Sequence, residues 1–378
     1  MNEFDDIRPF NDDEVTEAMN KLLQDTEFQE VMKFIFPEQK KENLISWLRS
    51  FRNRYDFQHQ LIKLLMYRIT DKCADSLECT GFENIRQDKN YTFISNHRDI
   101  VMDAALLCLL LSHDGYNTVE IAIGDNLLIR PWIKDLVRLN KSFIVKRGVG
   151  IRQMLEVSQH LSRYIHYAIT EKKESIWIAQ REGRAKDSND YTQESVLKML
   201  AMAGGADYRK AIMDLNIVPL SLSYEYDPCD FLKAKELQQK RDNPDFQKSP
   251  DDDLDNMRVG IFGYKGRIHF QFGQAINSDL KEIANETPKA EWFSKTASLI
   301  DREIFRNYCF YPINYVAYDR LENGNRFADR YTAEEAEKIN AYFDKQLGKI
   351  NLPDKDIPFL TEKILGMYAN PLKNHLNN

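Results

Sequence analysis

The sequence predicts an α/β protein in which a mainly parallel sheet is flanked by helices, with a helical N-terminal subdomain and a helical C-terminal region. From about residue 76, short apolar runs alternate with longer amphipathic stretches, which is typical of βαβ units. Before that point, apolar residues such as Val15, Met19 and Leu22 recur at helical spacing, and a helical period returns from about residue 290. We therefore predict a helical subdomain at 1–75, an α/β domain at 76–311 and a C-terminal helical extension at 312–378, packed on the core.

The α/β region contains five short apolar runs that we predict to be strands. They are Tyr91–Ser95, Val119–Ile123, Ser142–Val145, Ser175–Ala179 and Ile217–Ser223. The stretches predicted to be helical are Ile100–Leu111, Arg130–Leu139, Ile151–Thr170, Gln193–Met202 and Phe231–Arg241. Right-handed crossovers would place the carboxyl ends of the strands at one edge of the sheet, where ligands usually bind.

The segment after these units is predicted to be less regular. Residues Asn243 to Asp255 are polar and acidic, so we expect a surface loop. Arg258–Phe262 and Arg267–Phe272 have the pattern of a hairpin with Gly263 to Gly266 as its turn. The glycines at 260, 263 and 266 are a weak phosphate-loop motif, because no helix follows them at once, and we favour a structural role.

Composition excludes several classes of protein. The chain has 378 residues, of which 43% are hydrophobic, and a mean hydropathy of −0.56, as expected for a globular protein rather than a disordered or membrane-spanning one. The longest apolar run, Val101 to Leu111, is interrupted by Asp103 and is shorter than the roughly 20 residues of a spanning helix. The N-terminal segment lacks the order of a signal peptide, and the five cysteines form no CxxC pair. We expect a cytoplasmic protein with free thiols and no metal site.

Charge is unevenly distributed along the chain. The net charge is −7, yet the cationic window from Lys141 to Lys186 contains ten basic and four acidic residues and has a net charge of +6. A local cationic patch in an acidic protein favours an anionic ligand over nucleic acid. The competing interpretation, solvated helix faces, applies best to Arg163, Lys172 and Lys173.

The first block that could carry chemistry is Ser95-Asn96-His97-Arg98-Asp99, which follows a predicted strand and continues to Asp103 at the start of an apolar helix. A histidine at this junction lies at the ligand edge of the sheet and is suited to take a proton near neutral pH. A nearby carboxylate would hold the ring in one tautomer. Asp103 and Asp99 compete for that role; we favour Asp103, because Asp99 also fits a helix N-cap.

Three further blocks lie at the ends of predicted strands. Lys146 and Arg147 follow the apolar run Ser142–Val145, and guanidinium groups suit phosphate. A second cationic turn follows Ser175–Ala179, where a glycine allows close backbone approach to a ligand; it contains Arg181, Glu182, Gly183, Arg184 and Lys186. The last is Val218-Pro219 in an apolar run, where proline usually indicates an edge or a bulge.

In this order, the four blocks resemble those of the glycerolipid acyltransferase family. The matching segments are Asn96-His97 with Asp103, Phe143-Ile144-Val145-Lys146-Arg147, Glu182-Gly183-Arg184 and Val218-Pro219. The resemblance covers roughly residues 80 to 230, and the helical N-terminal segment is similar to that of the soluble plastid-type members. Two spacings depart from the family: five residues rather than four separate His97 from Asp103, and Arg184 follows Gly183 directly.

The resemblance implies acyl transfer from an acyl thioester, on acyl carrier protein or CoA, to a hydroxyl of glycerol-3-phosphate or 1-acylglycerol-3-phosphate. His97 would act as the base and Asp103 would orient it. Arg147, Arg184 and Lys146 would bind the acceptor phosphate, with Arg181, Glu182, Gly183 and Lys186 as further substrate-binding candidates. No cofactor or metal is implied beyond the thioester co-substrate.

Because the product is a lipid, peripheral contact with the inner face of the cell membrane is expected. An amphipathic N-terminal helix or the aromatic segment containing Tyr308, Phe310, Tyr311, Tyr315 and Tyr318 could supply it, although ordinary core aromatics are the favoured interpretation. Two other functions stay open. The acceptor could be another lipid, such as an acylated amino acid, or the chain could be an inactive lipid-binding homologue.

Overall fold

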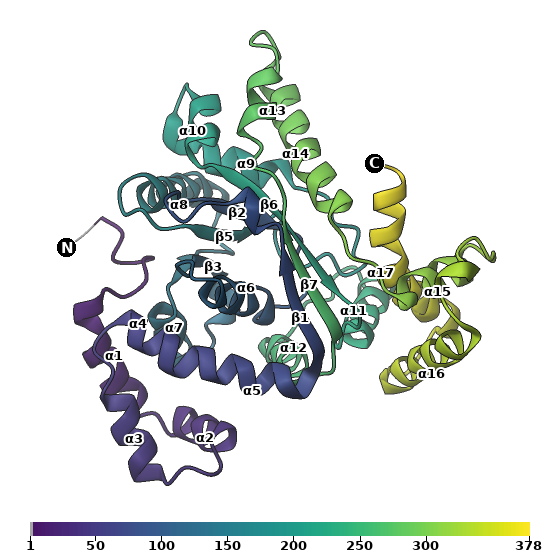
Figure 1. The fold of residues 1–378 in the computed structure, drawn as a ribbon, viewed down its shortest axis with the longest axis horizontal. Coiled ribbons are helices and arrows are strands. Elements are labelled where there is room, and N and C mark those ends of the chain that lie inside the picture. The colour runs from purple at the N-terminus through teal and green to yellow at the C-terminus, as the bar shows by residue number, and fades with distance from the viewer. Residues whose placement is uncertain (1–2) are drawn as a thin grey trace.

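A seven-stranded sheet forms the centre of the protein in the computed structural model, which describes residues 3–378 (Figure 1). The strand order is β1-β7-β6-β2-β5-β3-β4, and every neighbouring pair is parallel except β6 and β7. The bounds are β1 Ala74–Thr80, β2 Thr92–Ser95, β3 Glu120–Gly124, β4 Ser142–Val145, β5 Ile176–Ala179, β6 Ile217–Tyr224 and β7 Gly266–Phe272. The predicted α/β fold with a mainly parallel sheet is confirmed.

Helices cover the sheet and extend beyond it on both sides. The five at the N-terminus are α1 Val15–Leu22, α2 Thr26–Ile35, α3 Lys41–Arg49, α4 Arg54–Asp56 and α5 Lys63–Cys73. Those among the strands are α6 Met102–His113, α7 Pro131–Leu139, α8 Ile151–Thr170, α9 Glu194–Leu200, α10 Tyr208–Asp214, α11 Asp230–Asp242 and α12 Pro250–Phe262. The remainder are α13 Asn277–Glu282, α14 Lys289–Arg306, α15 Pro312–Leu321, α16 Ala333–Lys349 and α17 Ile357–Leu376.

The central strands are buried on both faces. All residues of β2 and β6 are buried, as expected for strands covered by crossover helices. Pro219 lies within β6, between β7 and β2, and not at an edge of the sheet. Its carbonyl accepts from Gly273 on the β7 side, where the β6–β7 register begins only at Leu220. The N–H that proline lacks would point to this same side, away from β2, so the ladder between β6 and β2 is not interrupted.

The N-terminal helices and the C-terminal helices lie on opposite sides of the molecule in Figure 1. The former enclose a cluster that includes Met19, Phe28 and Phe57 and is shared with Leu139 of α7. A second cluster joins α15, α16 and α17 to Ala234 of α11. The division of the chain at residues 75 and 311 stays a prediction.

The aromatic segment 308–318 belongs to the protein interior. Tyr308 and Tyr311 are buried, and Phe310, Tyr315 and Tyr318 are partly buried against the same core clusters. These rings therefore do not form an exposed membrane-binding face. Within residues 3–378, none of the helices combines the length and apolar character needed to cross a bilayer.

Two sequence-based predictions are wrong in the segment 243–272. The predicted hairpin does not form: 258–262 belongs to α12, and β7 pairs with β1 and β6. The predicted loop ends early, because Ser249 and Asp252 form a capping box that starts α12. Gly260 lies inside this helix, and a Cβ there would come within 2.0 Å of Asp99 Oδ2. This glycine thus permits close packing of α12 on the loop after β2.

Candidate active site

The candidate site lies at the carboxyl edge of the parallel strands. His97 follows β2, and the residues after β5, β3, β4 and β6 reach the same edge because these strands run parallel to β2 in one continuous set. Asn96 holds the β2 end to β6: its side chain donates to the Leu222 carbonyl at 2.9 Å and accepts from the Leu222 N–H at 2.8 Å. The histidine is therefore presented by a rigid strand end.

His97 is oriented by Asp103. Its Nδ1 lies 2.8 Å from Asp103 Oδ2, and the ring packs edge-on against Trp177 at 5.6 Å between centroids. A carboxylate only accepts hydrogen bonds, so Nδ1 donates and the lone pair resides on Nε2. The His97 side chain is 14% exposed, whereas Asp103 is fully buried. The tautomer with its proton on Nδ1 and its lone pair on Nε2 is the one that a general base needs.

Asp103 is held by other donors besides His97. Its Oδ2 also accepts from the backbone N–H groups of Arg98 (2.7 Å) and Asp99 (3.1 Å), and its Oδ1 accepts from the Tyr224 hydroxyl at 2.8 Å. Burial and the nearby Asp103 raise the pKa of Tyr224, which keeps its hydroxyl protonated and able to donate. The carboxylate is thus fixed at both oxygens before any ligand arrives.

Asp99, the alternative candidate, caps the helix instead. Its Oδ1 accepts from the N–H groups of Val101 (2.9 Å) and Met102 (2.8 Å), where α6 begins. Burial and the neighbouring Asp103 raise the pKa of the Asp99 carboxyl. The extra residue between His97 and Asp103 is accommodated in this capped turn, so the longer spacing still allows the His97–Asp103 contact.

The two lysines among the predicted substrate-binding residues have acidic partners. Lys146 is exposed and its Nζ lies 2.6 Å from Asp6 Oδ2. Lys186 pairs with Glu236 of α11, and burial lowers the pKa of Lys186 to about 8. Each ammonium is therefore neutralised within the protein, and both are less available to a ligand than an unpaired cation.

The arginines of the two cationic blocks are not paired in this way within the described residues. Arg184 Nη2 donates to Asn256 Oδ1 at 3.0 Å, while its Nη1 is buried without a hydrogen-bond partner, as is Arg181 Nε. Arg147 is partly exposed and its backbone N–H donates to Asp125 Oδ1 at 3.0 Å. These guanidinium groups retain donors for an anion.

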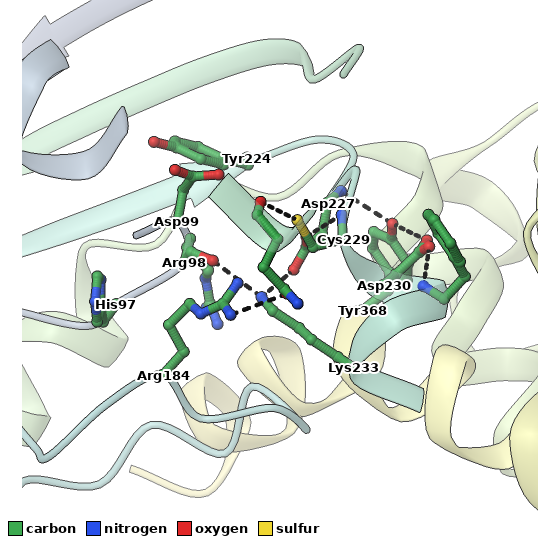
Figure 2. Close-up of polar contacts among 12 residues, drawn as sticks. His97, Arg98, Asp99, Arg184, Tyr224, Asp227, Cys229, Asp230, Lys233 and Tyr368 are labelled. Carbon is green, nitrogen blue, oxygen red and sulfur yellow. Dashed lines mark hydrogen bonds and ion pairs between the residues drawn. The ribbon is translucent and has the colours of Figure 1, made fainter. Parts of the chain in front are cut away.

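Arg184 lies closer to His97 than Arg147 does. Figure 2 shows the Arg184 guanidinium beside the Arg98 loop, with His97 on one side and Lys233 on the other. Arg147 follows β4, which is three strands from β2, or about 14 Å at the usual strand spacing. In the same turn as Arg184, Gly183 has a φ of +67°, which favours glycine, and Glu182 is exposed.

Several polar residues of the site were not singled out from the sequence. Arg98 is buried with its Nη2 2.8 Å from Asp190, and Lys233 and Asp227 lie beside the same loop (Figure 2), while Asn256 accepts a hydrogen bond from Arg184. Tyr224 directly follows the predicted strand Ile217–Ser223 and is the last residue of β6, so its place at the edge of the sheet could have been inferred from the sequence pattern. Arg98 stands beside His97 in the first block but was given no role, and Lys233, Asp227 and Asn256 lie on segments without a recognisable motif.

Residues 76–223 match the model of the family described as Acyltransferase, a range that contains His97, both cationic blocks and nearly all of β6. No curated protein matches the chain significantly. The solved structures that are similar include the 1-acyl-sn-glycerophosphate (LPA) acyltransferase PlsC from Thermotoga maritima, at 11% identity and a TM-score of 0.37, over 77% of this chain and 93% of that one.

Proposed function

We propose, from the match of residues 76–223 to the Acyltransferase family model, that the protein transfers a fatty acyl group from an acyl thioester to a hydroxyl of glycerol-3-phosphate or 1-acylglycerol-3-phosphate. The donor would be acyl carrier protein or acyl-CoA. The observation that carries the proposal is the His97 Nδ1–Asp103 Oδ2 contact at the edge of the sheet, inside the matched region.

In the proposed reaction, His97 Nε2 takes the proton of the acceptor hydroxyl while the oxygen attacks the thioester carbonyl. Asp103 stabilises the imidazolium that forms and keeps the ring in place. The C–S bond then breaks as the ester C–O bond is completed, and the proton passes from His97 to the departing thiolate. The step needs no metal or further cofactor.

Arg184 and Arg147 are the groups that we propose for the acceptor phosphate. Both retain guanidinium donors, and binding the phosphate would bring the hydroxyl and the thioester into reacting geometry. Lys146 and Lys186 make a smaller contribution in this proposal because Asp6 and Glu236 already neutralise them. Nucleic acid has no role in it, and contact with the membrane is peripheral.

The test is an acyl transfer assay with the full chain, labelled acyl-ACP and acyl-CoA, and three acceptors side by side: glycerol-3-phosphate, 1-acylglycerol-3-phosphate and an N-acyl amino acid. We expect a labelled ester with at least one phosphorylated acceptor and none without phosphate. Transfer to the N-acyl amino acid alone would assign another lipid acceptor. Absence of thioester consumption with every pair would contradict the enzymatic proposal.

A further inference from the structure

A buried lysine reaches the loop that carries His97 from outside the matched region. Lys233, on α11, is 1% exposed, and its Nζ donates to the backbone carbonyl of Arg98 at 2.9 Å (Figure 2). The same ammonium forms an ion pair with Asp227. None of the sequence blocks described above includes Lys233 or Asp227.

This contact completes a clamp on a single peptide unit. The Arg98 carbonyl and the Asp99 N–H belong to the same planar group, so fixing both ends fixes its orientation. The N–H donates to Asp103 Oδ2 at 3.1 Å, and the carbonyl accepts from Lys233. Because this peptide lies between His97 and its carboxylate partner, a rotation about it would change the distance that joins them.

The lysine is itself held in place by the C-terminal helices. Asp227 donates its backbone N–H to the Tyr368 hydroxyl of α17 at 3.0 Å, and its Oδ1 accepts from Cys229 N–H at 2.9 Å. Burial opposes ionisation of Asp227, but the cations Lys233 and Arg184 hold the pKa of this carboxyl below its usual value. Lys233 therefore faces a charged partner on one side and the Arg98 carbonyl on the other.

The start of α11 has a second anchor in the same helices. Asp230 is fully buried and accepts from the hydroxyls of Tyr342 (2.9 Å) and Tyr368 (2.8 Å), and also from Gln346. These three residues belong to α16 and α17. The segment that delivers Lys233 is thus fixed by the helices farthest along the chain.

We propose that Lys233 is a positioning residue for the acyl transfer reaction, acting on His97 through the Arg98 carbonyl. The expected effect on kcat rests on the proposed function, whereas the expected effect on the position of the His97 ring does not. The competing explanation is that Lys233 only neutralises the buried Asp227, in which case the Arg98 bond has no effect on His97.

A double substitution separates these two explanations. Lys233→Met alone removes both interactions and leaves a buried carboxylate uncompensated, which lowers stability. Adding Asp227→Asn removes that charge; Arg184 loses a neighbouring carboxylate in the same step, and the lost bond to Arg98 is the change that bears on His97. The matched control is Lys141→Met with Glu174→Gln. Lys141 is also buried and donates to a backbone carbonyl, that of Thr118 (2.9 Å), and to Glu174 (2.7 Å). Lys141 lies just before β4, at the amino ends of the strands, whereas the site lies at their carboxyl ends.

Two measurements on the full-length double variants give the result. With the best acceptor, we expect Lys233→Met/Asp227→Asn to lower kcat about 10- to 100-fold with KM within about twofold, because small misplacements of a catalytic group carry losses of this size. In selectively ¹⁵N-histidine-labelled protein, we expect the His97 ring resonances and their pH titration to change. The signals are assigned by their loss in His97→Gln. Neither quantity should change in the Lys141 control.

Wild-type kcat in the Lys233 double variant, or unchanged His97 resonances whatever the rate, would overturn the proposal and leave Lys233 as a charge partner of Asp227. The NMR measurement requires no substrate. If the wild-type protein transfers no acyl group, the proposed function fails on its own assay while the His97 resonances still decide whether Lys233 positions the ring.

Discussion

The ends of β2 and β4 lie at the same edge of one sheet but are built differently. After β2, the polar groups that surround His97 are buried and are bonded to one another, and Asp103 has donors at both oxygens. After β4, Lys146 is exposed and paired with Asp6, and Arg147 is partly exposed. The turn after β5 is intermediate, with Arg184 half-buried and one of its nitrogens unbonded.

This difference matches two different proposed roles, proton transfer at the end of β2 and anion binding at the ends of β4 and β5. The group that would move a proton is fixed in advance, so its geometry does not depend on a ligand. The groups that would bind an anion keep free donors, which a ligand can satisfy. Catalytic rate should therefore be most sensitive to the β2 end, and acceptor affinity to the ends of β5 and β4.

The largest effect is expected for His97→Ala. Loss of a positioned general base should lower kcat by about 10²- to 10⁴-fold while the protein stays folded, since Asp103 keeps its other three donors when the ring is removed. The measurement is kcat with the best acceptor, accompanied by thermal unfolding. His113→Ala, an exposed histidine at the end of α6, is the control. Substantial turnover by His97→Ala would remove the assigned base.

Arg184→Ala should mainly raise KM for the phosphorylated acceptor. A hydrogen bond to a charged group is worth about 1.5–3 kcal/mol, which corresponds to roughly a 10- to 100-fold change in KM. Initial rates measured over a range of acceptor concentrations check this. Arg258→Ala changes an exposed arginine of α12 and should leave KM unaltered. An effect of Arg184→Ala on kcat alone would show that this residue does not bind the phosphate.

A smaller effect is expected at the end of β4, where the two neighbouring cations should differ. Arg147→Ala is predicted to raise KM about three- to tenfold, because its guanidinium is free to meet an anion. Lys146→Ala should change KM less than twofold, since Asp6 already neutralises the ammonium. The same acceptor titration measures both. Equal effects would contradict the distinction, and an unchanged KM in Arg147→Ala would exclude it from the phosphate site.

The smallest effect is expected for Asp99→Asn. Asparagine preserves the cap on α6, so kcat should stay within about twofold of wild type. Because the pKa of Asp99 is raised in the folded protein, its contribution to stability is present at low pH and is lost as pH rises through the folded pKa. The variant should therefore lose less stability than wild type between pH 4 and pH 8 in urea unfolding.

Asp103→Asn is the matched comparison for Asp99→Asn. The asparagine amide would face His97 Nδ1 and the Tyr224 hydroxyl, which both donate to the carboxylate in the wild-type protein. The substitution should therefore lower both kcat and stability. A loss of activity in Asp99→Asn as large as in Asp103→Asn would reverse the assignment of their roles.

The central strands could be predicted from the sequence because both their faces are buried. Runs such as Ser142–Val145 and Ile217–Tyr224 are rich in β-branched and apolar residues, and their predicted bounds agree with the structure to within one residue. The first strand, Ala74–Thr80, was missed because it lies at an edge and alternates with polar residues, so the helical prediction ran into it. Helix α12 was missed because its first half is polar and acidic like a loop, and its apolar end at 258–262 resembles a strand.

The site divides in the same manner. His97 and its two candidate carboxylates share one short segment, so local spacing was enough to nominate them. The choice between Asp99 and Asp103 required the backbone geometry of the turn. There, Asp99 accepts from the N–H groups that begin α6, and Asp103 contacts the His97 ring. Lys233 and Asn256 reach the site from helices more than 100 positions further along the chain, and no local pattern indicates such contacts.

The close approach of Gly260 to Asp99 has a consequence for how the chain can be divided. The family match ends at residue 223, yet the turn that holds the histidine is covered by a helix that begins at Pro250. A fragment cut at the family boundary would contain every signature block, but Asp99 would lose the helix packed against it and Asp103 would lose the Tyr224 hydroxyl. We therefore expect that a fragment able to fold and act by itself extends beyond residue 223 and includes α12.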